Sequence, residues 1–567
     1  ITAQNRVQTA TLTTPLATIS HILAILVKQH FCTNRYQTYC MKKTILIILI
    51  ITTYTASFGQ NQSISQGVLF DGEPYITVNP SDPQHMVVAW MGYKPFQYII
   101  IKTKTTFDGG QSWTNTYEIP HTNPLYGSAD PSLAFDNNGN IFLCYIDFDV
   151  AIDSGSVYVR KSTDGGLSWG TAVEVINAHS DPGKYPIDRP WISIDRSGGN
   201  YDGHIYITTV SPTIFGQLAP PYYPYFIRSI NGGASFEPWK QLDTIGWLSG
   251  SIIPQPLASL STSTNGTIHA IYPSWVLTQN ISPQYFLTSS TDAGNSFSYK
   301  TALVTPSVFT DSLAKRAALF KTNPSDNDHL CFFYLGVEHG DADVFITESY
   351  DNGNTWSSSI RVNDDPIANN RMQDLVWADF DTDGDLLVTW RDRRNGNDST
   401  YTTDSEIYGS VRWKDSINFS PNFTITDSII AYDTILTSKG NDFMCTVFLN
   451  DTLNAVWGDN RDGNIKIFFQ RMAINGTSVS LRELSNETPP KISVFPNPTF
   501  SDLKIFGESI VQINVCNVEG KNILTKNYYD QQKPIKISLN EYPDGLYFLY
   551  IKTSVGNITK KIIKKEY

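Results

Sequence analysis

One short motif recurs five times along the chain, at intervals of about sixty residues, and each copy reads Ser/Thr-x-Asp/Asn-x-Gly-x-x-Trp/Phe. We expect the Asp or Asn side chain to accept hydrogen bonds from nearby backbone N–H groups, and the glycine to supply the positive φ of a tight hairpin. The aromatic residue is expected to pack the turn against its own sheet. The copies are Thr106–Trp113, Ser162–Trp169, Ser229–Phe236, Ser290–Phe297 and Ser349–Trp356.

A looser hairpin pattern precedes each motif and continues beyond the last one. Seven such hairpins predict seven four-stranded blades of a β-propeller over residues 60–477, with residues 63–70 closing the ring against the last blade. In the last two blades Trp390-x-Asp392-x-Arg394 and Trp457-x-Asp459-x-Arg461 replace the motif, and we interpret them as Asp–Arg braces within a blade. The hairpins begin at Gly72, Ala129, Asp188, Pro256, Lys315, Gln373 and Asn441.

The five motifs closely resemble the Asp-boxes of sialidase-like β-propellers. This resemblance implies an all-β fold, and in that superfamily the box is a structural turn remote from the active site. Because known sialidases have six blades, six is the alternative to the seven counted here. Sialidase chemistry would need an arginine triad, a Tyr nucleophile with a Glu partner, and an Asp acid/base. Arg189, Arg316 and Arg371 are the candidates for the triad, and no Tyr–Glu pair can be assigned.

The C-terminal residues 491–567 resemble the type A sorting domain of type IX secretion substrates in Bacteroidetes. The resemblance rests on Pro496-Asn497-Pro498, Gly520, Asp544–Tyr547 and the basic end at 560–565, after a polar linker at 478–490. It implies a small antiparallel β-sandwich, recognition by the type IX secretion machinery, and a secreted or outer-membrane surface location. By its residues alone, a carbohydrate-binding or adhesive module would fit this segment equally well.

We expect the first 59 residues to lie outside the folded part of the mature protein. We expect residues 1–40 to be an untranslated or non-native upstream extension, and 41–59 to be a signal peptide with a basic start and a short apolar core. No second apolar segment follows, so we expect no transmembrane span in the mature chain. The net charge of −12 argues against nucleic acid as a partner.

Charged residues occupy equivalent positions at the start of several hairpins. Glu73, Asp130 and Arg189 align, and each precedes a proline; three further charged residues fall within about one residue of that register. Since functional groups of propellers converge where the innermost strands open onto the channel, we expect this ring to bind a polar or anionic glycan. The alternative is that these charges fix ring closure. The remaining ring candidates are Arg316, Asp374 and Asp442, with Arg371 as a triad candidate.

The run Asp379-x-Asp381-x-Asp383 has the oxygen-rich spacing of a calcium loop. Its twelfth position is Trp390, where an EF-hand would place Glu, so a simple acidic turn is the favoured alternative to a Ca²⁺ site. We expect no cofactor to be required. Tyrosines in 219–226 could stack on sugars, or pack locally.

These features predict a secreted sialidase-like propeller that binds or hydrolyses extracellular glycans at the channel mouth. Whether it is an enzyme stays open at this point; if it is, a glycoside hydrolase of sialidase-like type is expected. The rivals are a non-catalytic surface or adhesive platform, and a polysaccharide lyase on the same scaffold, which would need a His or Tyr base. The histidines considered for that base are His85, His179, His204, His269, His329 and His339.

Overall fold

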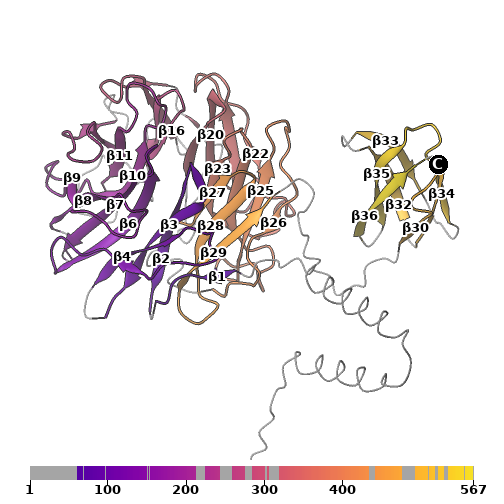
Figure 1. Cartoon of the computed structure of the whole chain (residues 1–567), viewed down its shortest axis with the longest axis horizontal. Coiled ribbons are helices and arrows are strands. Elements are labelled where there is room, and N and C mark those ends of the chain that lie inside the picture. Colours follow the sequence, from indigo (N-terminus) through magenta and orange to yellow (C-terminus); the bar gives the residue numbers. More distant parts are fainter. Residues whose placement is uncertain are drawn as a thin grey trace, which may run out of the picture. The chain divides into compact units, whose positions relative to one another are not determined.

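The computed structural model describes two separate units, Ile1–Ser480 and Leu481–Tyr567 (Figure 1). Every regular element within the described residues is a β-strand, and none of these residues forms a helix long and apolar enough to cross a membrane. The predicted upstream extension, signal peptide and linker lie outside the described residues. The structure describes residues 61–67, 69–95, 98–149, 151, 153–211, 224–242, 258–274, 284–300, 303–304, 318–432, 441–474, 492–507, 510–517, 521–528, 534–553 and 556–565.

The described part of the first unit contains seven antiparallel sheets, the blades of a propeller. In blades 1 to 6 the strands follow one another in chain order from the first strand outward. Blade 1 is β2 (Asp71–Asn79), β3 (Asp82–Tyr93), β4 (Ile99–Thr106) and β5 (Tyr117–Glu118); blade 2 is β6 (Tyr126–Phe135), β7 (Ile141–Asp149), β8 (Gly155–Ser162) and β9 (Val173–Asn177); blade 3 is β10 (Asp188–Ile194), β11 (Ile205–Val210), β12 (Pro224–Ser229) and β13 (Lys240–Gln241). Blade 4 is β14 (Ser259–Thr262), β15 (Ile268–Ser274), β16 (Gln284–Ser290), β17 (Ser298–Tyr299) and β18 (Leu303–Val304); blade 5 is β19 (Leu319–Asn323), β20 (Asp326–Gly336), β21 (Asp343–Ser349) and β22 (Ile360–Arg361). Blade 6 is β23 (Gln373–Phe380), β24 (Leu386–Asp392), β25 (Glu406–Arg412) and β26 (Phe423–Thr424), and blade 7 is β27 (Cys445–Leu449), β28 (Thr452–Asp459), β29 (Lys466–Ala473) and β1 (Gln62–Ser63).

The blades form a closed ring around a central channel. The first strand of each blade contacts the first strands of the two neighbouring blades, and β27 of blade 7 contacts β2 of blade 1. The ring is fastened by β1, which pairs with β29 through Gln62–Phe469 and Ser63–Phe468. The prediction of seven blades, with closure by residues 63–70, is confirmed, and the six-blade alternative is wrong.

Every first strand runs in the same direction along the channel, so the channel has two distinct ends. At one end the first strands begin. We call it the charged end, after Glu73, Asp130, Arg189 and Asp442. At the other end lie the turns between first and second strands and the Asp-boxes between third and fourth strands. We call this the turn end.

The Asp-boxes form the turns that their residues predict. In the first box the Gly110 N–H donates to Thr106 Oγ1 (2.9 Å), and the Ser112 N–H donates to Asp108 Oδ1 (2.9 Å). The glycine at this position has a φ of 88° in the first box and 81° in the fifth, which a residue with a Cβ adopts only with strain. Side-chain oxygens of the box therefore accept the hydrogen bonds of backbone N–H groups within each turn.

The expectation that each box aromatic packs against its own blade is wrong. Trp113 of blade 1 contacts Phe469 of blade 7, with ring centroids 5.1 Å apart. Trp169 of blade 2 donates its indole N–H to Thr103 Oγ1 of blade 1 (3.1 Å). Phe297 of blade 4 likewise contacts Phe226 of blade 3. These aromatic rings therefore pack between neighbouring blades and bury apolar surface there.

We predict that the boxes contribute to stability against acid. Hydrogen bonds from Ser112, Ser296 and Thr355 lower the pKa values of Asp108, Asp292 and Asp351 to about 2. A depressed carboxylate pKa stabilises the fold above the unfolded value, about 3.9, and this contribution disappears as pH falls toward 2.

The chain supplies the control, because the third box carries Asn231, which accepts from the Ser235 N–H at 3.0 Å in the same turn. A variant with Asn at all three Asp positions should fold normally at pH 7 and lose less stability than the wild type between pH 4 and 2 in urea unfolding. An unchanged acid slope would contradict this.

The Asp–Arg braces of the last two blades are confirmed. Asp392 Oδ2 accepts from Trp390 Nε1 (2.7 Å) and from Arg394 Nη2 (2.9 Å). In blade 7, Asp459 Oδ2 accepts from Trp457 Nε1 (3.0 Å) and Arg461 Nη2 (2.7 Å). In each brace the buried carboxylate is paired with an arginine, so it is not left as an uncompensated buried charge.

The second unit is the predicted small antiparallel β-sandwich. Apolar side chains from both of its sheets, including Leu503, Ile513, Ile537 and Leu549, form one core. One sheet contains β30 (Ser493–Phe495), β31 (Asp502–Phe506) and β34 (Ile535–Ser538), and the other contains β33 (Asn522–Asn527), β32 (Ile510–Cys516), β35 (Gly545–Thr553) and β36 (Gly556–Lys564).

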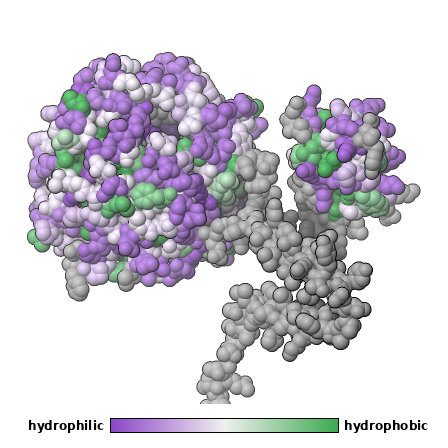
Figure 2. All heavy atoms as spheres, viewed as in Figure 1, coloured by the Kyte–Doolittle hydropathy of each residue, from purple (hydrophilic) through white to green (hydrophobic). Residues whose placement is uncertain are grey.

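The face of the protein seen in Figure 2 is mainly hydrophilic, with small apolar groups between the polar ones.

Candidate functional site

A β-bulge near the start of the first strand presents charged residues to the channel. The pairing of β2 with β3 shifts register between Gly72 and Tyr75, and the same shift occurs in blades 2, 3 and 6. The bulged residue has a positive φ, 54° at Glu73, 52° at Asp130 and 50° at Arg189. Leu375 and Asn441 share this conformation, so the bulge belongs to the architecture and is not in itself a sign of function.

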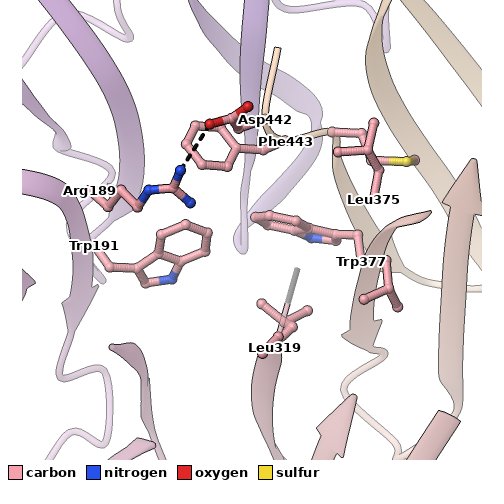
Figure 3. Close-up of a pocket in the computed structure, with 10 residues that line it drawn as sticks. Arg189, Trp191, Leu319, Leu375, Trp377, Asp442 and Phe443 are labelled. Carbon is pink, nitrogen blue, oxygen red and sulfur yellow. Dashed lines mark hydrogen bonds and ion pairs between the residues drawn. The ribbon is translucent and has the colours of Figure 1, made fainter. Parts of the chain in front are cut away.

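Four of the predicted residues come together at this end: Glu73, Asp130 and Arg189 at the bulges, and Asp442 directly after the positive-φ residue Asn441. Arg189 Nη2 donates to Asp442 Oδ2 at 2.9 Å (Figure 3). Its Nε lies 3.8 Å from Asp188 Oδ2, and its backbone N–H donates to Asp130 Oδ2 at 3.2 Å. We call these residues together with Asp188 the charged cluster. Its side chains come from blades 1, 2, 3 and 7, which are far apart in the sequence.

Glu73 and Asp130 form a buried carboxyl pair within this cluster. Glu73 is only 3% exposed. Burial, together with the charges of Asp130 and Asp442 and a hydrogen bond to the Asp130 carboxyl, raises the pKa of Glu73 well above its ordinary range. Burial also raises the pKa of Asp130, although Arg189 opposes this. With the pKa values of both carboxyl groups raised, this pair holds a proton more readily than ordinary acidic side chains do.

We predict that Glu73→Gln stabilises the protein at alkaline pH. Because the folded-state pKa of Glu73 is raised, the folded state binds a proton more tightly than the unfolded state, so stability falls as pH rises above about 4.3. Glutamine can donate the same hydrogen bond to Asp130 without a proton to lose, and its carbonyl can still accept from the Asp442 N–H, now 3.3 Å from Glu73 Oε1.

The measurement is urea unfolding of wild type and variant at pH 6 and pH 9. The wild type should lose more stability over this interval than Glu73→Gln. Parallel losses would mean that Glu73 is ionised throughout, and Glu73→Ala, which removes the hydrogen bond itself, serves as the destabilised control.

Asp188 differs from this buried pair because its side chain is accessible to solvent and its pKa lies near neutral pH. Its side chain is 26% exposed, compared with 18% for Asp442 and 13% for Arg189. Burial raises its pKa to about 7, with Asp130 and Asp442 adding to the effect and Arg189 opposing it. A carboxyl group that is half protonated near pH 7 can act as a general acid, and the adjacent Arg189-bound Asp442 can act as its carboxylate partner.

A layer of aromatic side chains lies directly beneath the charged cluster and divides the channel. Trp191 and Trp377 have ring centroids 5.4 Å apart, and Tyr75 contacts both at 5.7 Å. Phe443 lies against Trp191, with centroids 6.3 Å apart. A cavity of about 20 Å³ lies between Arg189, Asp442 and this layer (Figure 3). A substrate at the charged end would therefore lie on the mouth and not pass through the channel.

The structure does not bring the other predicted residues into the cluster. Asp374 lies one residue before the bulge position, which Leu375 occupies, and it is buried with Arg391 and Arg393. The Arg371 guanidinium donates to the carbonyl oxygens of Gly396 and Asp398. Arg316 lies outside the described residues.

The three carboxylates of the predicted calcium loop also do not converge. Asp379 Oδ1 accepts from Lys321 Nζ (3.0 Å), Asp381 Oδ2 from the Asp451 N–H (2.7 Å), and Asp383 Oδ2 from Lys414 Nζ (2.7 Å). The three side chains thus point to different partners. Calcium binding here stays a prediction, and the geometry offers no shared ligand set for it. Within the described part of 219–226, Tyr225 and Phe226 are buried in β12.

Within the described residues, one other group has metal-ligand chemistry: His329, Cys331 and Glu348. Its carboxylate is already bound by Arg412, whose Nη1 lies 2.6 Å from Glu348 Oε2. The histidine also has a structural equivalent. His329 Nδ1 contacts Asn323 Nδ2 (2.9 Å), and His85 of blade 1 contacts Asn79 in the same way (3.2 Å). We therefore interpret this group as a blade-joining network.

None of the histidines considered for a lyase base belongs to the charged cluster. His269, for example, is fully buried against Ser289, and burial lowers its pKa to about 3. Sequence reasoning missed His121, which contacts Asp147 (2.8 Å) and Ser128 (3.0 Å) near the charged end. Both partners contact the same nitrogen, Nδ1, so these residues do not form a Ser–His–Asp triad, in which the two ring nitrogens have different partners.

Comparison with known proteins supports the C-terminal assignment directly. Residues 493–565 match the family model of the secretion system C-terminal sorting domain. This domain marks proteins exported by type IX secretion, so the protein is secreted or lies on the cell surface. No curated protein matches the chain at a significant level.

Three solved structures illustrate what the fold is similar to. A protein of unknown function from Dyadobacter fermentans is 14% identical over 73% of this chain and 99% of its own, with a TM-score of 0.39. An α-L-arabinanase from Penicillium chrysogenum is 13% identical over 59% of this chain and 93% of its own (TM-score 0.39), and the NanB sialidase from Streptococcus pneumoniae is 13% identical over 74% and 71% (TM-score 0.36). At these values no activity is transferred, and the assignment of an Asp-box propeller rests on this chain's own boxes and blades.

Proposed function

We propose that this exported protein hydrolyses glycosidic bonds of a neutral extracellular glycan at the charged end of its channel. The observation that carries the proposal is the accessible Asp188, with a pKa of about 7, beside the Arg189–Asp442 ion pair. Two carboxyl groups of different protonation state are the basic requirement of most glycosidases. The sorting domain supports the extracellular setting.

Each member of the trio has a role in this proposal. Asp188, when protonated, gives its proton to the leaving glycosidic oxygen. Asp442, paired with the guanidinium 2.9 Å away, stabilises the positive charge that develops on the sugar, either directly or through a water. One guanidinium contacts both carboxyl groups, which keeps them within the roughly 10 Å that glycosidase pairs span.

The charge of the site favours a neutral substrate. Four acidic residues and one arginine form the cluster, so a sialic acid or uronate carboxylate would meet repulsion at this end. Of the arginine triad that sialidase chemistry would need, only Arg189 belongs to the cluster among the described residues; the Arg371 guanidinium is bound to loop carbonyls. We therefore favour a glycoside hydrolase of neutral glycans over a sialidase.

The test is a reducing-end assay of the exported protein on neutral polysaccharides, with sialosides and polygalacturonate as anionic comparisons. Turnover confined to neutral substrates and lost in Arg189→Ala supports the proposal. Arg196→Ala, at the turn end of the channel, is the matched control and should retain turnover. Turnover of anionic glycans would contradict the charge argument, and binding without any turnover would instead favour a non-catalytic platform.

A further inference from the structure

A second, larger cavity of about 320 Å³ opens at the turn end of the channel. Its walls are the last residues of the first strands, and the aromatic layer of Tyr75, Trp191 and Trp377 forms its floor. The same tryptophans line the small cavity beneath the charged cluster. The aromatic layer therefore separates two compartments with different chemistry. The volume of the second lies in the range of sites for small ligands, about 300–1,000 Å³.

Hydroxyl groups from neighbouring blades form much of the cavity wall. Ser193 Oγ contacts Thr262 Oγ1 at 2.8 Å, and Ser261 Oγ contacts Thr322 Oγ1 at 2.8 Å. Each such pair uses one proton and one acceptor, so the hydroxyls keep further hydrogen-bonding capacity. The wall thus offers donors and acceptors of the kind that sugar hydroxyls use, above an aromatic floor.

The charge of this compartment is opposite to that of the charged cluster. Lys321 and Asp379 line the cavity as an ion pair, with Nζ and Oδ1 3.0 Å apart. Asp379 is satisfied, since its Oδ2 accepts from the Phe448 N–H at 3.1 Å. Arg196 adds a second positive charge at the mouth of the cavity.

Arg196 is the feature of this cavity that points to a ligand. Its side chain is exposed to solvent at the cavity mouth, and its guanidinium has no hydrogen bond or ion pair within the part of the chain that the structure describes. Partial desolvation by the neighbouring cavity wall lowers the pKa of Arg196, and Asp379 is the acidic group that opposes this effect. Arginine presents a planar fork that matches a carboxylate with two parallel hydrogen bonds.

We propose that the turn-end cavity binds a small sugar acid, with its carboxylate on Arg196 and its hydroxyls on the Ser/Thr wall. The cavity is closed from the charged end by the aromatic layer, so this site is separate from the proposed hydrolytic site. The inference does not depend on the proposed function. It assigns to the protein a second ligand of opposite charge preference.

The experiment is calorimetric titration of the exported protein with D-glucuronate, D-glucose and acetate. We expect saturable binding of glucuronate and affinities at least about 10-fold weaker for glucose and acetate, because each lacks one half of the recognition. If glucose binds as well as glucuronate, or if glucuronate does not bind at all, the proposal is wrong. Equal binding of acetate would overturn the sugar part of the assignment.

Three variants test whether glucuronate binds at the turn end of the channel. Arg196→Gln should weaken glucuronate binding at least about 10-fold and should leave the thermal midpoint unchanged, since this guanidinium makes no hydrogen bond or ion pair with any of the described residues. Arg196→Lys, which keeps the charge, should retain part of the affinity. Asp188→Asn, at the charged end, should bind glucuronate like the wild type. Undiminished binding in Arg196→Gln would refute the site.

Discussion

Asp188→Asn will lower kcat/KM for the proposed glycan hydrolysis by about 10²- to 10⁴-fold, which is the usual contribution of a positioned general acid. Asparagine has the same shape and can still contact Arg189, whose Nε lies 3.8 Å from Asp188 Oδ2. It has no proton to transfer to the leaving oxygen. The fold should be unaffected, because Asp188 is partly exposed at the channel mouth.

Two readouts distinguish proton transfer from a general loss of the site. The wild-type rate should fall as pH rises above about 7, the pKa of Asp188, since only the protonated carboxyl is active; the variant should lack this limb. A substrate with a 2,4-dinitrophenyl leaving group needs little acid assistance, so it should be turned over nearly as well by the variant. An equal loss on both substrates would mean that Asp188 is not the acid.

The architecture could be predicted from the sequence because its signals are local. A glycine with positive φ and an Asp or Asn side chain that bonds within four residues define each box without reference to the rest of the chain. The same holds for the first three bulges, where Glu73, Asp130 and Arg189 each precede a proline. The packing of the box aromatics could not be predicted in this way, because their partners, such as Phe469 for Trp113, lie in another blade.

The candidate site was harder to predict, because its electrostatics depend on blades that are distant in sequence. In blade 6, Leu375 occupies the bulge position. Aligning the hairpins by their charged residues therefore selects its neighbour Asp374 instead. Asp188 was overlooked although it directly precedes Arg189. Its raised pKa arises from burial and from Asp130 and Asp442, and no local motif signals such an environment.

Asp374→Asn will destabilise the propeller by about 3–5 kcal/mol, the cost of removing one partner from a buried ion pair. Asp374 is fully buried, and Arg391 Nε and Arg393 Nη1 donate to its Oδ1 at 2.7 and 3.1 Å. Burial alone would raise its pKa, but the two arginines hold the pKa of Asp374 well below the ordinary range. The amide would leave two buried guanidinium groups without a compensating charge.

Asp383→Asn is the matched control for this prediction, since it makes the same substitution in blade 6 at an exposed pair. Asp383 Oδ2 lies 2.7 Å from Lys414 Nζ, and both side chains are 47% exposed; such a pair is screened by water and contributes little. Urea unfolding should separate the two variants clearly. The comparison also decides between the two roles considered for Asp374, because a structural residue lowers stability while the folded fraction keeps its kcat, whereas a catalytic one would lower kcat with stability close to that of the Asp383 variant.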